Sequence, residues 1–319
     1  MATRLAPRVA AVGMASWDRV LVVQRYPEAG AYEIVRREVE LPGGTTTNTA
    51  VALARIGARV SLAGMVGDDH DGERLRQALD AESGIDSRWL AIRHGEPTDA
   101  STIIASADPP ERTIFWHQGA QLRRGDQLDI AAILDHDLVL LDVADAPLRR
   151  WLTDLPAHFA PRSRLLGTLT YVAGSDEPDS LEVVLRHDAI VGSERETLLL
   201  TGGASADHAT RLIQEAMPGA NLRAWVFSRG AMGCRVVTRD AIADVPGFEA
   251  DVVDVTGAGD AFAAGIAYGF ARRWEWRRTG RLANAIGALS TRALGAQASL
   301  PTPEELSVLL RESRGTLFS

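Results

Sequence analysis

The residues best suited to chemistry lie at positions 252–262, which read Val-Val-Asp-Val-Thr-Gly-Ala-Gly-Asp-Ala-Phe. A β-branched stretch runs into a glycine turn and then into an expected helix with apolar residues at Phe262, Ile266 and Phe270. Glycines let the backbone turn its amides outward, and the N-terminus of a helix adds positive potential, so this junction can bind an anion. Asp260 would lie in the first helical turn, where its carboxylate could take a proton from a hydroxyl that attacks a bound phosphoryl group.

The motif has two other interpretations. Asp260 could merely cap the helix, because acidic residues are common in first helical turns. A dinucleotide-binding fingerprint does not fit, because Phe262 occupies its third glycine position and no βαβ unit with the required acidic residue follows. Taken alone, the motif leaves helix capping and catalysis equally open.

The cationic residues narrow the chemistry, because all 34 of them are arginines and the chain contains no lysine. The absence of lysine excludes a phosphate-binding loop of the Gly-x-x-x-x-Gly-Lys-Ser/Thr type, a protein-kinase site built on a strand lysine, and Schiff-base catalysis. If this chain handles phosphates, backbone amides and arginines must hold them.

Charge and cysteine content narrow the partners and the compartment. The net charge of −8 argues against nucleic acid or an anionic membrane surface as the main partner, because both favour basic surfaces. The single cysteine, Cys234, lies in an apolar run and is expected to be a buried thiol, which fits a reducing compartment. Residues 1–8 hold no apolar signal core, and no run approaches the ~20 apolar residues of a membrane span. A cytoplasmic location is expected.

Short β-like runs alternate with helical runs along most of the chain, which is typical of a largely parallel sheet covered by helices. The expected strands are Arg8–Val12, Val60–Met65, Asp137–Leu141, Leu165–Thr168, Ala189–Val191 and Ala224–Phe227. The expected helices are Thr47–Ile56, Gly72–Ala81, Ala206–Ala216, Asp260–Arg272 and Arg281–Leu294.

Two segments interrupt this alternation. Val20–Val23 and Tyr32–Leu41 have the pattern of two strands joined by a turn, and Ser101–Ala105 and Thr113–His117 have the same pattern. We expect these two hairpins to form a small separate sheet over the main body.

Residues 252–262 resemble the signature of the PfkB, or ribokinase-like, carbohydrate kinase family. Several further segments, in order along the chain, resemble the same family. Gly13 and Asp18 resemble the first-strand element whose aspartate holds substrate hydroxyls. The other matching segments are Leu-Pro-Gly-Gly-Thr-Thr-Thr-Asn-Thr-Ala at 41–50, Ala-Arg-Ile-Gly at 54–57, Gly-Met-Val-Gly-Asp-Asp at 64–69 and Ser-Arg-Gly-Ala-Met-Gly at 228–233.

The resemblance implies a fold and an activity. The fold would be an α/β, ribokinase-like three-layer sandwich with a central, mostly parallel sheet. A small β-sheet lid, formed by approximately residues 16–42 and 98–120, would be inserted in a single kinase domain spanning residues 1–319. The activity would be transfer of the γ-phosphate of ATP to a hydroxyl of a sugar or a sugar-like small molecule.

The resemblance also implies roles for individual residues. Asp260 would be the general base beside an anion hole made by the amides of Gly257, Ala258 and Gly259. Asp18, Gly43, Gly44 and Asn48 would bind the acceptor. Ser193, Ser228, Gly230, Gly233 and Asn284 would line the ATP site, and Glu196 would organise Mg²⁺ through water. Asp254, Thr256, Gly295 and Ser299 match a monovalent-cation site, for K⁺, found in some family members.

Two departures from the family pattern bear on these roles. Ser193 stands where the family commonly has an asparagine, three residues before Glu196. Residues 167–171 read Gly-Thr-Leu-Thr-Tyr, in place of the Asp-Pro-Asn-x-Arg-like stretch of many sugar-acid and fructose kinases. The second departure weakens the assignment to those substrates.

The acceptor stays open at this point. A nucleoside kinase of the same family is the main alternative, and the aromatic residues that could stack on a base are Trp17, Tyr32, Phe115 and Trp116. A phosphosugar is also open as a substrate, because Arg36, Arg37 and Arg112 flank the lid strands and could pair with a second phosphate. A non-catalytic, ligand-binding relative is a third alternative. Because lid sheets with apolar edges often pair with a second copy, a homodimer through the lid is expected.

Overall fold

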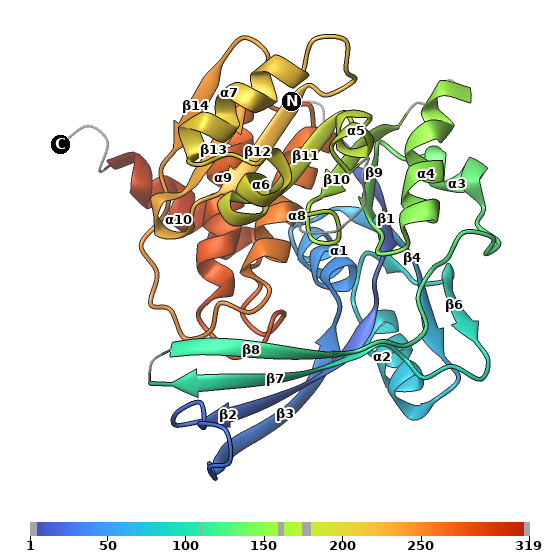
Figure 1. Ribbon diagram of the computed structural model, residues 1–319, viewed down its shortest axis with the longest axis vertical. Coiled ribbons are helices and arrows are strands. Elements are labelled where there is room, and N and C mark those ends of the chain that lie inside the picture. The colour runs from blue at the N-terminus through green and yellow to red at the C-terminus, as the bar shows by residue number, and fades with distance from the viewer. Residues whose placement is uncertain (1–4, 109, 159–162, 174–179, 316–319) are drawn as a thin grey trace.

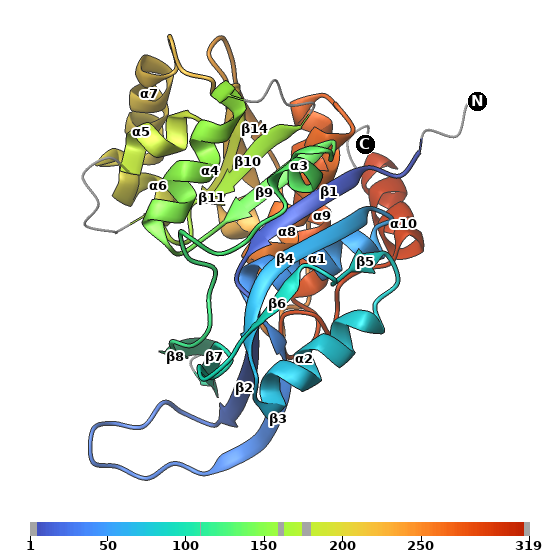
Figure 2. The same cartoon turned by 90° about the vertical axis from the view of Figure 1, so that its right-hand side faces the viewer.

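The computed structural model describes residues 5–108, 110–158, 163–173 and 180–315, and Pro109, inside the second expected lid segment, lies outside the described residues. A large sheet with helices on both faces forms the main body, and a small sheet extends from one end of it (Figures 1 and 2). The α/β architecture expected from the alternating pattern is therefore confirmed.

The large sheet contains all six expected strands and is parallel except at one end. Its order is β14-β13-β12-β11-β10-β9-β1-β4-β5, with β6 paired to β4. Only the β12–β13 and β13–β14 pairings are antiparallel among its described strands. The strands are β1 (Arg8–Gly13), β4 (Arg59–Gly67), β5 (Ile85–Asp86), β6 (Leu90–Arg93), β9 (Leu138–Asp142), β10 (Arg164–Thr168), β11 (Ala189–Ser193), β12 (Ala224–Ser228), β13 (Cys234–Val237) and β14 (Ile242–Val245).

The five expected helices are present, and one of them is displaced along the sequence. The helices are α1 (Thr45–Arg55), α2 (His70–Asp80), α3 (Ile130–Leu134), α4 (Ala146–His158), α5 (Ser180–Leu185), α6 (Glu194–Thr201), α7 (Ala206–Ala216), α8 (Ala258–Ala271), α9 (Trp276–Ser290) and α10 (Pro303–Gly315). The prediction of a helix over Arg281–Leu294 was wrong at both ends. The helix starts early because the Trp276 ring stacks on Phe270, with the ring centroids 5.2 Å apart.

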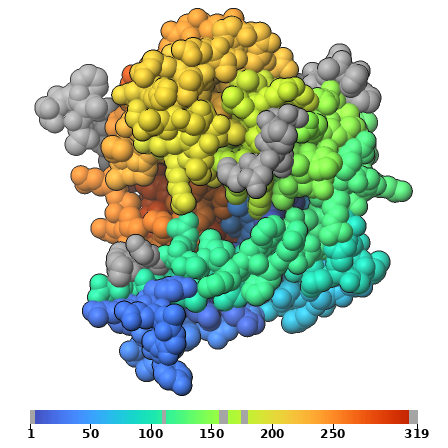
Figure 3. All heavy atoms as spheres, viewed as in Figure 1, coloured from blue at the N-terminus to red at the C-terminus, as the bar shows by residue number. Residues whose placement is uncertain are grey.

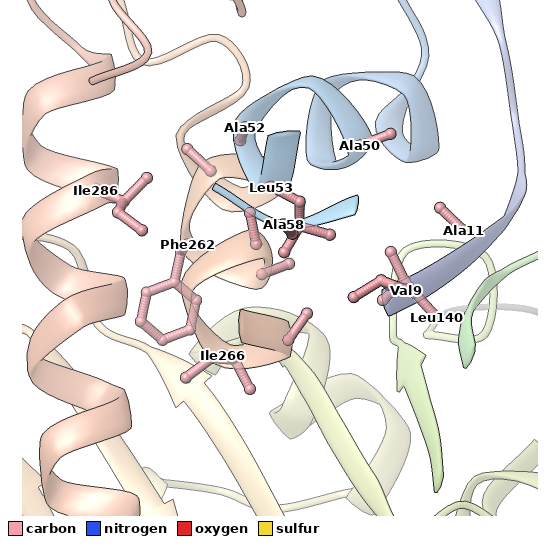
Figure 4. Close-up of a cluster of buried hydrophobic side chains, with 14 of the residues drawn as sticks. Val9, Ala11, Ala50, Ala52, Leu53, Ala58, Leu140, Phe262, Ile266 and Ile286 are labelled. Carbon is pink, nitrogen blue, oxygen red and sulfur yellow. The ribbon is translucent and has the colours of Figure 1, made fainter. Parts of the chain in front are cut away.

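The two faces of the large sheet are covered by different helices, as alternate residues of β1 show. Val9 and Ala11 belong to the buried cluster that includes residues of α1, α8 and α9, whereas Ala10 and Val12 pack in a cluster with α3 and α4. Figure 4 shows the first cluster, in which Phe262 of α8 lies among apolar side chains. Burying such side chains contributes about 25 cal/mol per Å² of apolar surface, so this packing holds α8 firmly beside the sheet.

The small sheet is built from the two expected hairpins. It contains β2 (Ser16–Val23), β3 (Val35–Gly43), β7 (Ala100–Ala107) and β8 (Pro110–His117), in the order β3-β2-β7-β8. The parallel β2–β7 pairing joins the hairpins. The expected strand start at Tyr32 was wrong, because Tyr32 is fully exposed in the loop before Val35. That this sheet closes over a ligand as a lid stays a prediction.

Candidate active site

The expected site residues gather where parallel strands of the large sheet end. Ligands of open α/β sheets bind at this carboxyl edge, because the loops there leave a crevice between the helices. A cavity of about 580 Å³, called the first cavity here, lies between this edge and strands β2, β7 and β8. Figure 3 shows the molecule hollowed between the small sheet and the helices opposite it. Strand-end residues that line this cavity are Met14, Asp142, Thr168, Ser193 and Ser228.

Asp260 projects into the first cavity from the first turn of α8. The preceding turn needs a glycine at position 257, because its φ is +74° and a Cβ there would lie 2.4 Å from the Ala296 Cβ. Oδ2 of Asp260 accepts a hydrogen bond of 2.8 Å from Nδ2 of Asn48. Burial raises the pKa of Asp260 to about 8, against the lowering effect of this hydrogen bond.

Asn48, expected to bind an acceptor, also orients Asp260. Its Nδ2 donates to Asp260, and its Oδ1 accepts a hydrogen bond of 2.9 Å from Nε2 of Gln297. These two bonds use opposite ends of the amide, so Asn48 cannot rotate freely. Oγ1 of Thr49 lies 3.3 Å from the backbone oxygen of Asp260, although its hydroxyl also has the backbone oxygen of Thr45 as a nearer acceptor, at 2.9 Å. Helix α1 thus sets the position of the Asp260 carboxylate.

The glycine turn before Asp260 provides an anion site that differs in one respect from the expected one. The amide of Ala258 donates to the backbone oxygen of Val255 at 3.2 Å, so it closes a turn. The amides of Gly259 and Asp260 lie in the first helical turn, where a helix has no intrahelical acceptors for its N–H groups. These amides, together with the helix dipole, can hold a negatively charged group.

Asp18 lines the side of the first cavity formed by the small sheet. Its Oδ1 accepts a hydrogen bond of 2.8 Å from Oγ of Ser16. Burial raises the pKa of Asp18 to about 6, although hydrogen bonds from Ser16 and Ser101 lower it. Gly43 lies so close that a Cβ there would be 2.1 Å from Oδ2 of Asp18, and Gly44 has a φ of +92°. The expected acceptor residues therefore lie together.

A second cavity, of about 550 Å³, meets the first one. The two cavities share Ser228, Gly259 and Phe262. Gly230, Gly233 and Asn284, all expected at an ATP site, line the second cavity. The side chain of Asn284 is already engaged, because its Nδ2 donates to the backbone oxygens of Val245 at 3.0 Å and of Pro246 at 2.9 Å. Asn284 therefore shapes this cavity by holding the chain after β14.

Ser193 and Glu196 line the first cavity, where they cap helix α6. Both the backbone amide and the hydroxyl of Ser193 donate to Oε2 of Glu196 at 2.7 Å. In the part of the chain that the structure describes, no group of three or more His, Cys, Asp or Glu side chains could hold a metal ion. A Mg²⁺ ion here would need phosphate oxygens as well as Glu196, which is how Mg²⁺ binds in many phosphotransferases.

The four residues of the expected monovalent-cation site lie in two adjoining loops. Oδ1 of Asp254 accepts from the backbone amide of Thr256 at 2.9 Å and from its Oγ1 at 2.7 Å. Oδ2 of Asp254 accepts from the amide of Gly295 at 2.8 Å, and Oγ of Ser299 donates to the backbone oxygen of Ser290 at 2.6 Å. The Asp254 and Ser299 side chains thus fasten the loops, and backbone oxygens are the better candidates for cation ligands.

Sequence reasoning missed part of the first cavity. Asp142 is 2% exposed and lines the cavity beside Thr168 and Tyr171. The hydroxyls of Thr46 and Thr168 both donate to its carboxylate, the former at 3.1 Å. One signal was available, since Asp142 directly follows the expected strand Asp137–Leu141. Among the expected aromatic residues, Trp116 lines the cavity, whereas Trp17 is buried under Arg74 and Tyr32 is exposed.

Comparison with known proteins gives consistent matches along the whole body of the molecule. The family model described as pfkB family carbohydrate kinase matches residues 6–303. The ATP-dependent ribose-1-phosphate kinase of Halopiger xanaduensis is 28% identical over 313 residues, covering 96% of this chain and 98% of that protein. The nucleoside kinase of Methanothermobacter thermautotrophicus is 24% identical over 305 residues, covering 92% of this chain and 93% of that protein.

A solved structure shows the same fold. Arabidopsis thaliana ribokinase, complexed with ribose and ATP, has a TM-score of 0.81 and 21% sequence identity to this chain. The match covers 96% of this chain and 99% of that one. Both the large and the small sheet are therefore part of the shared fold.

Proposed function

The chain belongs to the pfkB family of carbohydrate kinases, phosphotransferases that act on hydroxyl groups, and we propose that Asp260 is the general base of its reaction. The acceptor would be a sugar or a sugar-like molecule bound in the first cavity, and ATP would lie in the second. One observation carries this proposal: Asp260 lines the first cavity directly after Gly259, a residue that lines both cavities.

The proposed reaction uses the geometry at this junction. Asp260 takes the proton of the acceptor hydroxyl as its oxygen bonds to the γ-phosphorus, and the bond from that phosphorus to the β–γ bridging oxygen breaks to release ADP. The amides of Gly257, Gly259 and Asp260 face the charge on the transferred group. Mg²⁺, when bound through water to Glu196, would neutralise part of the phosphate charge.

The remaining residues bind and orient the two substrates. Asp18 and Asn48 offer directional hydrogen bonds to acceptor hydroxyls, and Gly43 and Gly44 let the acceptor approach the backbone. In the second cavity, the nucleotide would contact Ser228, Gly230 and Gly233, with Asn284 holding the chain behind them and Ser193 bordering the phosphates.

A K⁺ site is proposed in the loops joined by Asp254, next to the glycine turn. Backbone oxygens near Thr256, Gly295 and Ser299 would coordinate the ion and steady the amides that face the phosphate. Replacing K⁺ by tetramethylammonium at constant ionic strength should then lower kcat several-fold. Unchanged turnover in tetramethylammonium would remove K⁺ from the proposal and leave the role of Asp260 intact.

A nucleoside kinase activity is the second candidate, and one observation favours it. Trp116 and Ile114 of β8 line the first cavity, opposite the carboxyl edge of the large sheet, and could contact a base. The non-catalytic alternative is disfavoured, because the chain belongs to a kinase family and has Asp260 and both glycines of the turn.

Purified protein should be incubated with Mg-ATP and a panel of sugars and nucleosides, with ADP release and product mass as the readouts. We expect turnover with at least one hydroxyl acceptor and a product heavier by one phosphoryl group. The Asp260→Asn variant should lose that turnover. Tight acceptor binding without product from any compound would instead support a binding protein and contradict the proposal.

A homodimer and a cytoplasmic location complete the proposal. Phe115 of the edge strand β8 is 46% exposed and does not line the first cavity, so it leaves apolar surface for a second copy. Light scattering should give twice the monomer mass, and Phe115→Ser should shift the mass toward the monomer.

Among the described helices, none is both long and apolar enough to cross a membrane. Cys234 is free and buried, as expected in a reducing compartment.

A further inference from the structure

The floor of the first cavity holds a carboxylate to which the proposed mechanism gives no role. Asp142 ends β9 and pairs with Gly13 at the end of β1. It is 2% exposed and lines the cavity with Thr168 and Tyr171. A carboxylate this buried is seldom retained without partners or a ligand, because removal from water disfavours its charge.

Threonine hydroxyls fix how the Asp142 carboxylate can be used. The amide of Met14 donates to Oγ1 of Thr46 at 2.9 Å, so the Thr46 hydroxyl must direct its own proton elsewhere. That proton goes to Oδ2 of Asp142, at 3.1 Å. The hydroxyl of Thr168 donates to Oδ1. The Thr45 hydroxyl also hydrogen-bonds to this carboxylate. Three of the about four acceptor positions of the two oxygens are thus used, so Asp142 can still receive one hydrogen bond from a molecule in the cavity.

The charges around the first cavity are unequal. The acidic side chains that line it are Asp18, Asp142, Glu196 and Asp260. Arg112 is the one basic side chain among the described lining residues, and it lies on β8, exposed at the edge of the cavity. Burial raises the pKa of Asp142, and the negative charge of Glu196 acts in the same direction. Four carboxyl side chains against one exposed guanidinium make this cavity rich in hydrogen-bond acceptors and unfavourable for a further negative charge.

The other arginines considered for a phosphosugar lie away from this cavity. Arg36 and Arg37 are in β3, at one edge of the small sheet, whereas β8 forms the opposite edge. Neither is among the residues that line the first cavity. An anionic group on an acceptor would thus have Arg112 as its one described side-chain cation and several carboxylates as neighbours.

We infer that Asp142 is an acceptor-binding residue that takes a hydroxyl or ammonium hydrogen at the cavity floor. The cavity thereby favours uncharged or cationic acceptors over acceptors that carry a phosphate or carboxylate. This inference rests on the proposed function, because it concerns the acceptor of that same reaction. Its physical basis is that like charges in a site shielded from water repel strongly, while a donor hydrogen satisfies the buried carboxylate.

The test compares matched acceptors with the wild-type enzyme. Ribose should be compared with ribose 1-phosphate, and glucose with glucosamine and gluconate, each by ADP release and product mass. For the neutral compound of a pair that is turned over, kcat/KM should exceed that of its anionic analogue at least about 100-fold. The amino sugar should match or exceed the neutral sugar.

The Asp142→Asn variant removes the charge and keeps the shape. It should narrow the neutral-to-anionic ratio at least tenfold, mainly through KM, with kcat for the neutral acceptor changed less than about threefold. Asp240→Asn, at an exposed turn between β13 and β14, is the matched control and should leave the ratio unchanged. Thermal unfolding of both variants separates lost binding from lost structure.

Different results would overturn different statements. Equal wild-type turnover of neutral and anionic acceptors would overturn the inference while the kinase function stands. Efficient turnover of an anionic acceptor that Arg112→Gln abolishes would also overturn it, since Arg112 would then set the charge preference. Turnover of no acceptor at all would instead contradict the proposed function. If Asp142→Asn fails to fold, the wild-type ratios alone still decide the charge preference.

Discussion

The two cavities that meet at Gly259 have similar volumes but are lined by different kinds of residues. The first, about 580 Å³, is lined by four carboxylates and several threonines and serines. The second, about 550 Å³, is lined largely by glycine, alanine, valine and phenylalanine, with Glu249 as the one charged residue among its described lining. The first cavity can bind a ligand through directional hydrogen bonds, whereas the second can bind one mainly through a close steric fit.

This difference indicates how each substrate is selected. Buried polar groups left unpaired destabilise a complex, so the first cavity should discriminate sharply among acceptors. The second cavity depends on close backbone approach, so added bulk should matter more there than lost charge.

Removing the Asp260 carboxylate should have the largest effect. Asp260→Asn retains the volume and can still accept the Asn48 hydrogen bond, but it cannot take a proton from the acceptor. We expect kcat to fall about 10²- to 10⁴-fold, with the Kd for ATP changed less than about threefold. Steady-state kinetics and calorimetric ATP titration measure the two effects. The Asp251→Asn variant, which changes an exposed residue nine positions earlier, controls for loss of charge. Wild-type turnover by Asp260→Asn would refute the assignment of Asp260 as the base.

Adding one methyl group to the second cavity should have the next largest effect. Gly233 has a φ of +91°, and a Cβ there would lie 2.1 Å from the backbone oxygen of Val245. Gly233→Ala should therefore raise the KM for ATP at least about tenfold and lower Tm.

Gly230→Ala is the matched control for this methyl group. Gly230 also has a positive φ, of +58°, but a Cβ there would meet nothing within 4 Å. The Gly230→Ala variant should lose only about 1–2 kcal/mol of unfolding free energy, because an alanine is strained in the left-handed backbone region. Equal effects of the two variants on the KM for ATP would contradict the claim that the shape of the second cavity governs ATP binding.

The pH profile should report the carboxylates of the first cavity. The pKa values of Asp260 and Asp18 are raised to about 8 and about 6, and the ionised forms are the ones required. The value of kcat/KM should rise with pH through pH 8 and level off above about pH 9, about tenfold above its value at pH 7, with a steeper fall below pH 6. A profile flat between pH 6 and 9 would contradict these assignments.

The same raised pKa predicts a smaller effect on stability. The pKa of Asp260 in the folded protein, about 8, is above its unfolded value of 3.8, so its stabilising contribution is present below pH 3.8 and is lost as pH rises to 8. Asp260→Asn should therefore unfold at higher temperature than wild type at pH 8, by roughly 2 °C or more for about 1 kcal/mol. The difference should vanish near pH 4. Calorimetric scans at both pH values measure it, and lower stability of the variant at pH 8 would contradict the burial argument.

The smallest effect is expected from the charge in the second cavity. Glu249 is exposed, so its interaction with a nucleotide is screened by solvent. Glu249→Gln should change the KM for ATP less than about threefold. A tenfold change would show that the second cavity, like the first, selects its ligand by charge.

Much of this architecture was predictable from short-range patterns. The six central strands and both hairpins were predicted, because alternating and β-branched runs set which residues can be buried in a sheet. The start of α9 at Trp276 was not, because it depends on stacking against Phe270 from another helix. Strands β13 and β14 were also missed, since four-residue strands carry little periodic signal.

By itself, the sequence determined that phosphate must be bound without lysine, that Asp260 follows a glycine turn, and that the chain resembles the pfkB kinases. These features depend on residue type and local spacing. The folded chain was needed to place Asp142 at a cavity floor, to separate Arg36 and Arg37 from that cavity, and to bring Asn48 against Asp260. Such facts depend on which distant strands pair and which helices pack together, and long-range pairing leaves no local pattern in the chain.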